Sequence, residues 1–238
     1  MDFNLSKPNR KVHAGIILTH GATEMLDIAA FETFVWMDKA GCKVLNLPEE
    51  MWVDAIDFEL HWVTEDGKTA ELRCGTQVQA TDSFATCPPL DIALMGASNV
   101  AFNITQGEIA YLRKVWDECS AFLTICGGCT ALVTAGLLAG KTVAYPSLFI
   151  RGMQKHVPDV NWVEKRWSCD GKLWSSGNQL NGLDMMRAFA EATWGGRTGM
   201  IEALYDIAGY PKRDVDFKDF VGHNYPADDF PSDFPTGA

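Results

Sequence analysis

The chain has 238 residues, which is long enough for one large α/β domain with a substantial core. Its formal net charge of −11 argues against nucleic acid or an anionic membrane surface as a partner. No apolar run reaches transmembrane length, and the first residues lack the apolar core of a secretory signal. The seven cysteines, an odd number, favour reduced thiols and a cytoplasmic protein over a disulfide framework.

The first half of the chain alternates short apolar runs with stretches of helical spacing. Apolar runs bounded by glycine or polar turns predict buried parallel strands, and an Asp-Gly pair between two strand-like runs predicts a hairpin. In chain order these patterns predict a strand at 12–18, a helix at 24–39 that stops at Gly41, a strand at 42–47, hairpin strands at 58–64 and 69–73, a strand at 91–95 and a helix at 107–119.

The second half continues the alternation and ends in a different composition. The patterns predict a strand at 121–125, a helix from Cys129, a short strand at 140–145, a second hairpin at 162–168 and 172–175, and helices at 180–194 and 199–208. From Pro211 on, acidic and aromatic residues accumulate. We therefore divide the chain into an N-terminal extension (1–10), an α/β domain (11–210) and an acidic, aromatic C-terminal arm (211–238).

Strands that alternate with helices predict a doubly wound, mostly parallel sheet of the flavodoxin-like kind. In such sheets the ligand site lies at the carboxyl ends of the strands. Three segments should meet there: the loop after the first strand (20–27), the loop after the strand at 91–95 (Gly96 to Asn99), and Cys126.

The stretch around Cys126 carries the strongest functional signal. An apolar strand at 121–125 stops at Cys126, two glycines follow, and a small-residue helix begins at Cys129. This order is typical of a nucleophile elbow, in which the turn glycines permit a strained backbone and close packing of strand and helix. A helix N-terminus stabilises negative charge, so we expect the Cys126 thiol to ionise more easily than a free cysteine.

Two other interpretations of Cys126 stay open. It could be a buried structural cysteine, which is a common fate of this residue. It could also form a redox pair with Cys129, because the two have C-x-x-C spacing. The histidines, by contrast, show no ligand spacing, and no second C-x-x-C pair is present, so the sequence predicts neither a metal site nor an organic cofactor.

The element order, the elbow cysteine and the run Ala-Gly-Leu-Leu-Ala-Gly-Lys (135–141) resemble the ThiJ/PfpI superfamily of class I glutamine amidotransferase-like fold. The stretch from Ile201 to Phe217 is similar to the isonitrile hydratase branch, and the resemblance covers residues 11–217. It implies that Cys126 is the nucleophile and Asp27 the acid, with Glu24 as the alternative acid. It also implies a homodimer.

The chain departs from that branch at several positions. Gly127 follows the nucleophile where the branch often has threonine, and no histidine stands there as in protease-like and glyoxalase-like relatives. Gly96 is followed by Ala97 rather than by a second glycine. At Tyr145 and its neighbours, many relatives have a histidine or asparagine, so no third member of a triad can be assigned.

The resemblance implies hydration of an isonitrile, a small electrophile, to an N-substituted formamide. In this hypothesis a Cys126 thiolate attacks, a protonated Asp27 supplies the proton, and a thioimidate forms. The N–H groups of Gly127 and Ala97, next to Gly96, would hold developing negative charge. The alternatives are a lyase or hydrolase acting on another electrophile, a thiol redox sensor using Cys126 and Cys129, and a non-catalytic binding protein.

Overall fold

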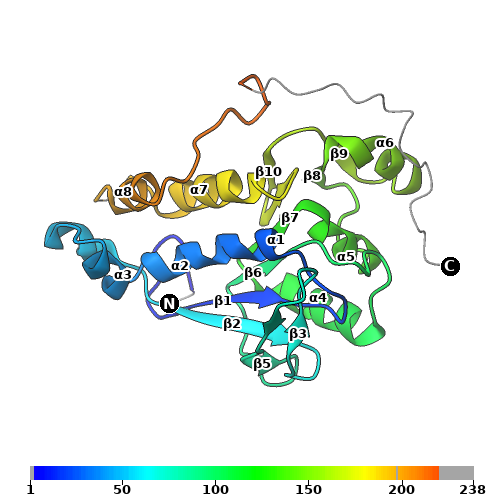
Figure 1. Cartoon of the computed structure of the whole chain (residues 1–238), viewed down its shortest axis with the longest axis horizontal. Helices are drawn as coiled ribbons and strands as arrows, with labels where there is room; N and C mark the ends of the chain where they lie inside the picture. Colours follow the sequence, from blue (N-terminus) through cyan, green and yellow to red (C-terminus); the bar gives the residue numbers. More distant parts are fainter. Residues whose placement is uncertain (1–2, 197, 220–238) are drawn as a thin grey trace.

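The computed structural model describes residues 3–196 and 198–219 and is built around a central sheet (Figure 1). The strands of this sheet are β1 (Val12–Ile17), β2 (Phe58–Thr64), β5 (Asp82–Ser83), β6 (Ile92–Met95), β7 (Ala121–Ile125), β10 (Trp167–Asp170) and β11 (Leu173–Ser176). They lie in the order β10-β11-β7-β6-β1-β2-β5. Only the β10–β11 pair is antiparallel, so the mostly parallel sheet predicted from the sequence is confirmed.

Helices cover both faces of the sheet. They are α1 (Met25–Ala29), α2 (Thr33–Trp36), α3 (Lys39–Val44), α4 (Gln106–Glu118), α5 (Cys129–Thr134), α6 (Ser147–His156), α7 (Asn181–Trp194) and α8 (Met200–Ile207). Two small sheets pair β3 (Ala70–Glu71) with β4 (Gln77–Val78), and β8 (Thr142–Ala144) with β9 (Asn161–Val163). In Figure 1, α7 and α8 lie on the side of the sheet that also carries α1 and α2.

The strands send alternate side chains into two separate cores. Val12, Ala14 and Ile16 of β1 pack with α1, α2, α7 and α8, whereas Ile17 packs with α4 and α5. This period of two is the geometry of a strand with a hydrophobic layer on each face. Two buried faces explain why the parallel strands are continuous apolar runs in the sequence.

The strand predicted at 42–47 is wrong, because this segment begins within α3. Asp38 caps that helix, its carboxylate accepting a hydrogen bond from the backbone N–H of Gly41 at 2.6 Å. The helix buries only Gly41 and Cys42 and leaves Val44 72% exposed. A short segment with alternating apolar residues does not distinguish a strand from one helical turn, and here the cap decides.

The first predicted hairpin is also wrong. Gly67 does turn the chain with a φ of 74°, but β2 then pairs in parallel with β1 and β5. The segment after the turn instead forms β3, which pairs with β4. An Asp-Gly pair fixes a local turn, yet the partner of the following strand depends on which sheet edge is free.

The second predicted hairpin is correct around Asp170 and Gly171, where β10 and β11 pair. Its first arm is shorter than predicted, since residues 161–163 belong to β9 and pair with β8. The sequence interpretation missed α6, which follows Pro146 and buries only Ile150 and Met153.

Both ends of the described chain pack on the domain. The indole N–H of Trp194 donates to the carbonyl of Leu5 at 2.7 Å. The buried guanidinium of Arg166 pairs with Asp219 at 2.6 Å. The rest of the predicted C-terminal arm, residues 220–238, lies outside the described residues. No helix in the described ranges is both long and apolar enough to span a membrane.

Close packing at the start of α5 makes a prediction for Gly128. A Cβ added there would overlap the backbone carbonyl of Met95, which cannot move without shifting β6. We expect Gly128→Ala to lower the free energy of unfolding by about 1–3 kcal/mol, the usual cost of overpacking. Gly107→Ala is the matched control, because its Cβ meets only the flexible end of Glu65. Equal denaturant midpoints for the two variants would contradict the prediction.

Candidate functional site

Cys126 lies in a strained turn between β7 and α5. Its φ is 55°, in the left-handed region that side chains other than glycine rarely adopt. One turn of 3-10 helix at residues 126–128 joins it to α5, and Cys126 is partly accessible. A strained, partly accessible cysteine at the carboxyl end of a central strand is the geometry of a nucleophile elbow.

Asp27 approaches this turn from α1 and is completely buried. Its Oδ2 accepts a hydrogen bond from the backbone N–H of Ala97 at 2.7 Å, while its buried Oδ1 has no partner among the described residues. The approach requires glycine at position 96, because a Cβ there would lie 2.6 Å from the Asp27 Cβ. The loops after β1 and β6 therefore meet beside Cys126, as the sequence predicted.

Burial controls the protonation of Asp27. Loss of solvation raises the pKa of Asp27 to about 7, the Ala97 N–H acts against this rise, and the charge of Glu24 adds to it. A carboxyl group with this pKa can both accept and release a proton near neutral pH, which suits general acid–base chemistry.

The expectation of an easily ionised Cys126 is wrong for this site. Burial, followed by the negative charge of Asp27, raises the pKa of the Cys126 thiol to about 12, and a hydrogen bond from the Gly127 N–H only partly opposes this. Near neutral pH the resting pair is therefore a Cys126 thiol beside Asp27 that is partly ionised, rather than a thiolate beside a protonated acid.

Glu24, the alternative acid, has a different environment. Its side chain is 29% exposed and pairs with Arg73 at 3.2 Å. An ion pair between partly exposed side chains of this kind contributes little to stability. The geometry thus favours Asp27 over Glu24 as the group that exchanges a proton with Cys126.

The two backbone donors named from the sequence are already engaged. The Ala97 N–H is directed at Asp27, and the Gly127 N–H is directed at the Cys126 sulfur. The Ala97 N–H therefore orients the Asp27 carboxylate, while the Gly127 N–H lies where it contacts the Cys126 sulfur.

Tyr145, to which the sequence assigned no role, lies beside the elbow. It follows β8, is 4% exposed, and a Cβ on Gly127 would lie 4.0 Å from its hydroxyl oxygen. Burial, with the nearby Cys129 and Cys126, raises the pKa of Tyr145, so its hydroxyl keeps its proton and can donate. The signal available in the sequence was its place at the end of a predicted strand, at the edge where the site was expected.

Cys129 is fully buried in α5 and its pKa is raised by the loss of solvation. All seven cysteines are free thiols. Because thiol exchange requires an accessible thiolate, a buried Cys129 does not favour the redox-pair interpretation.

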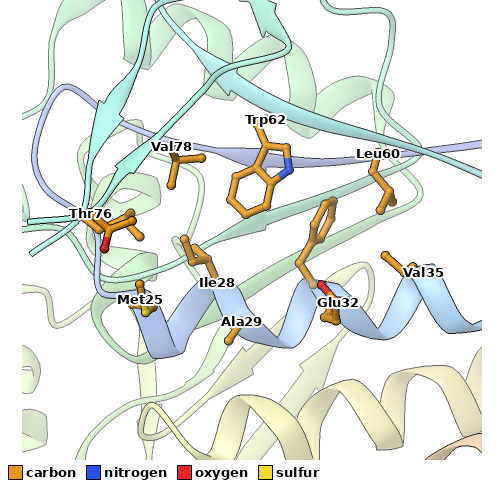
Figure 2. Close-up of a pocket in the computed structure, with 11 residues that line it drawn as sticks. Met25, Ile28, Ala29, Glu32, Val35, Leu60, Trp62, Thr76 and Val78 are labelled. Carbon is orange, nitrogen blue, oxygen red and sulfur yellow. The ribbon is translucent and has the colours of Figure 1, made fainter. Parts of the chain in front are cut away.

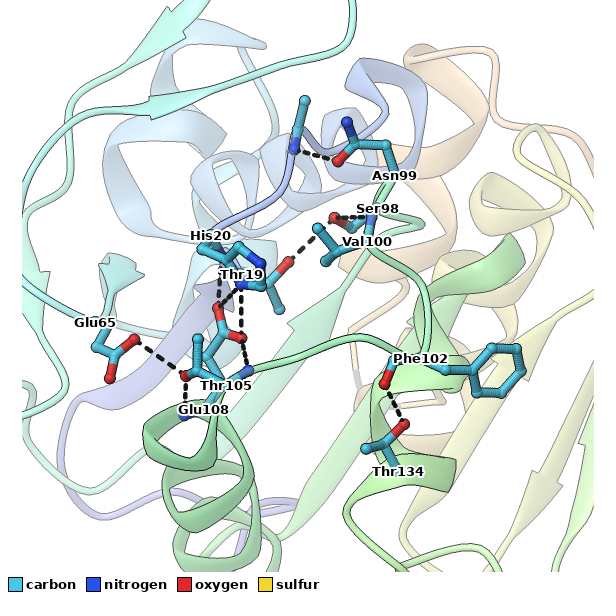
Figure 3. A network of polar contacts seen from close by, with 11 residues as sticks. Thr19, His20, Glu65, Ser98, Asn99, Val100, Phe102, Thr105, Glu108 and Thr134 are labelled. Carbon is cyan, nitrogen blue, oxygen red and sulfur yellow. Dashed lines mark hydrogen bonds and ion pairs between the residues drawn. The ribbon is translucent and has the colours of Figure 1, made fainter. Parts of the chain in front are cut away.

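A polar network contacts the loop after β1, which leads into α1 (Figure 3). The buried carboxylate of Glu108 accepts hydrogen bonds from the backbone N–H groups of His20 at 2.5 Å and Thr105 at 2.7 Å. The same glutamate completes the capping box of α4. Asn99 accepts from the Ala22 N–H at 2.8 Å. One buried side chain thus couples the start of α4 to the loop after β1.

Two cavities lie next to this site. One, of about 310 Å³, runs along the other side of α1 between Met25, Val35 and the indole of Trp62 (Figure 2). The other, of about 500 Å³, is lined by polar residues at the ends of β1 and β2. Neither is lined by Cys126 or Asp27, so neither is the space in which the proposed nucleophile would act.

Comparisons with known proteins agree with this fold. The chain is 25% identical to isonitrile hydratase from Pseudomonas putida over 168 residues, which are 67% of this chain and 70% of that protein. It superimposes with a TM-score of 0.67 and 14% identity on a ThiJ/PfpI family protein from Pseudomonas syringae, covering 88% of this chain and 78% of the other. With Drosophila melanogaster DJ-1beta the TM-score is 0.64 at 19% identity, covering 85% and 100%. No family model matches the chain.

The fold is therefore that of the ThiJ/PfpI and DJ-1 proteins. Together with the sequence similarity to isonitrile hydratase, it supports assignment of the chain to the ThiJ/PfpI superfamily.

The burial of Asp27 makes a prediction about stability and pH. Because the folded-state pKa of Asp27 is raised from 3.8 to about 7, ionising Asp27 destabilises the folded protein, and stability falls as pH rises through that range. The free energy of unfolding of Asp27→Asn should therefore gain on that of wild type as the pH rises from about 4 to about 7. Above pH 7 the gain should stay constant at about 2–4 kcal/mol.

Urea unfolding of both proteins across this pH range measures the difference. Glu24→Gln is the control. Its stability relative to wild type should not increase with pH in this way, because the Glu24 carboxylate is partly exposed and paired with Arg73. A difference between wild type and Asp27→Asn that stays constant with pH would show that Asp27 is not buried as described.

Proposed function

We propose that the protein is a cysteine-dependent lyase that hydrates an isonitrile to an N-substituted formamide. The observation that carries this proposal is a strained elbow cysteine next to a buried carboxyl group whose pKa is raised to about 7. The similarity to isonitrile hydratase from Pseudomonas putida supports the choice of substrate class. A small electrophilic substrate and a homodimer belong to the same proposal.

In the first half of the reaction Asp27 takes the thiol proton as the Cys126 sulfur attacks the terminal carbon of R–N≡C. The same proton is returned to that carbon, so a C–S and a C–H bond form and give the thioimidate R–N=CH–S-Cys. The high pKa of free Cys126 is overcome only during attack, because Asp27 accepts the proton in the same step.

In the second half, Asp27 activates a water that adds across the C=N bond. The C–S bond then breaks, the thiol recovers its proton, and R–NH–CHO leaves. The hydroxyl of Tyr145 is close enough to the elbow to donate a hydrogen bond to the substrate nitrogen as it gains electron density. No redox step is needed, since water supplies both the oxygen and the hydrogens of the product.

The central test is turnover of an aryl isonitrile, followed by the appearance of the formamide. Cys126→Ala should lose all activity above buffer, and Asp27→Asn should lose about 100-fold or more in kcat, as expected for loss of a general acid–base. Glu24→Gln, the matched control, should stay within a few-fold of wild type because Glu24 pairs with Arg73.

If the wild type forms no formamide, isonitrile is the wrong substrate, and another small electrophile acting on the same pair is then favoured. Equal losses in Asp27→Asn and Glu24→Gln would remove the distinction between the two acids. Intact-mass detection of a thioimidate on Cys126, absent in Cys126→Ala, would identify the intermediate.

Tyr145→Phe removes one donor while keeping a ring against Trp162 and Phe149. We expect kcat to fall about 10–100-fold with little change in KM, the pattern for a donor used in the transition state. Tyr111→Phe is the control, because Tyr111 packs against Phe84 away from the elbow. A loss in KM alone for Tyr145→Phe would assign it to substrate binding instead.

A further inference from the structure

Two histidines that are 48 positions apart in the chain meet on one face of the sheet, toward the start of β1. His13 is the second residue of β1 and pairs in register with Glu59 of β2, while His61 of β2 pairs with Gly15. Because successive side chains of a strand alternate, His13, Glu59 and His61 point to the same face. Gly15, which lies opposite His61 in the register, has no side chain, and the Leu90 side chain packs against it.

The two rings point nitrogen to nitrogen. The Nδ1 of His13 lies 3.0 Å from the Nε2 of His61, and the Nδ1 of His61 lies 2.9 Å from Oδ2 of Asp82 in β5. An ionised carboxylate only accepts, so the Nδ1 of His61 carries the hydrogen and its Nε2 keeps a lone pair toward His13. A carboxylate that fixes the tautomer of a histidine in this way is the usual outer partner of a metal-bound histidine.

We propose that His13, His61 and Glu59 bind a divalent cation of the zinc type, with Asp82 orienting His61. One ligand atom from each of the three residues lies within 4.8 Å of the others. Two nitrogens at 2.0–2.1 Å from a tetrahedral zinc are about 3.3 Å apart, so the observed pair needs to open by only a few tenths of an ångström. The charges of Glu59 and Asp82 together balance a doubly charged ion.

The surroundings favour binding by His13, Glu59 and His61 over binding by a second group of possible ligands that also contains His61. The second group consists of His61, Asp82 and Cys87. In that group the His61 nitrogen that faces Asp82 is Nδ1, which donates its hydrogen to the Asp82 carboxylate and so has no lone pair for an ion. Glu59 is 49% exposed, and its contact with Lys11 is long, at 3.9 Å, so the carboxylate is free to turn to an ion. An exposed third ligand leaves a route from solvent and room for water in the fourth position.

The experiment uses the full chain stripped with EDTA and then titrated with Zn²⁺ against a chromophoric chelator. We expect about one equivalent to bind and to raise Tm, and Glu59→Gln and His13→Gln each to weaken binding by about tenfold or more. Asp82→Asn should weaken it about 10–100-fold while leaving the ligands in place. His156→Gln, on α6, is the matched control and should bind as wild type.

Cobalt reports which atoms bind. A four-coordinate Co²⁺ complex with strong visible bands and no thiolate charge-transfer band supports the nitrogen and carboxylate site. A thiolate band, less than about one tenth of an equivalent of bound metal, or unchanged affinity in Glu59→Gln would overturn the proposal. If His13→Gln fails to fold, Glu59→Gln still decides, because its exposed side chain can change without loss of packing. Binding here is independent of Cys126, so the result stands whatever the enzyme assay shows.

Discussion

The structure depends on one costly interaction, the burial of the Asp27 carboxyl group beside the Cys126 thiol with a single hydrogen bond from Ala97. An ionised carboxylate inside a protein is unfavourable unless it is paired or fully hydrogen-bonded, and here one oxygen has no partner among the described residues. The rest of the domain must supply the free energy that holds it. An unfavourable group that the rest of the domain must stabilise is typical of functional sites, where stability is given up for activity.

Close contacts and buried hydrogen bonds surround Asp27 and Cys126. Gly96 lets Asp27 approach, and Gly128 lets α5 lie against the end of β6. Glu108 accepts hydrogen bonds from two backbone N–H groups, one in the loop after β1 (His20) and one at the start of α4 (Thr105). It thereby ties the loop to the helix. A buried capping residue fixes backbone position more firmly than a surface contact would, because leaving its donors unsatisfied costs free energy. The position of the Asp27 carboxyl group relative to the Cys126 thiol is therefore set by contacts in the segments that follow β1, β6 and β7.

Much of this arrangement follows from the sequence, and the exceptions have a common cause. The strand that ends at Cys126 was predictable, because apolar runs and glycine turns indicate local structure. The meeting of the loops beside it was predictable because the carboxyl ends of parallel strands lie at one edge of the sheet. The partner of β3 and the contact between His13 and His61 were not. Each is decided by which distant segment lies alongside, and spacing along the chain carries no information about sheet register. The high pKa of Cys126 was missed for the same reason, since it depends on burial and on Asp27 rather than on the helix that follows.

Gly127 stands where the isonitrile hydratase branch, which the sequence resembles, often has threonine. The structure shows another hydroxyl group near this position. A threonine after the nucleophile would place a hydroxyl at the elbow, whereas glycine places none. Tyr145 brings a hydroxyl to within 4.0 Å of the position where a side chain of residue 127 would begin, from the end of β8 instead of from the elbow. A larger side chain at 127 would also crowd Ala97, whose Cβ lies 3.2 Å from that position. Because the Ala97 N–H donates to Asp27, glycine at 127 leaves the Asp27 carboxyl group in place. In the proposed reaction the hydroxyl donor then comes from Tyr145, which lies on a different element and needs no movement of that loop.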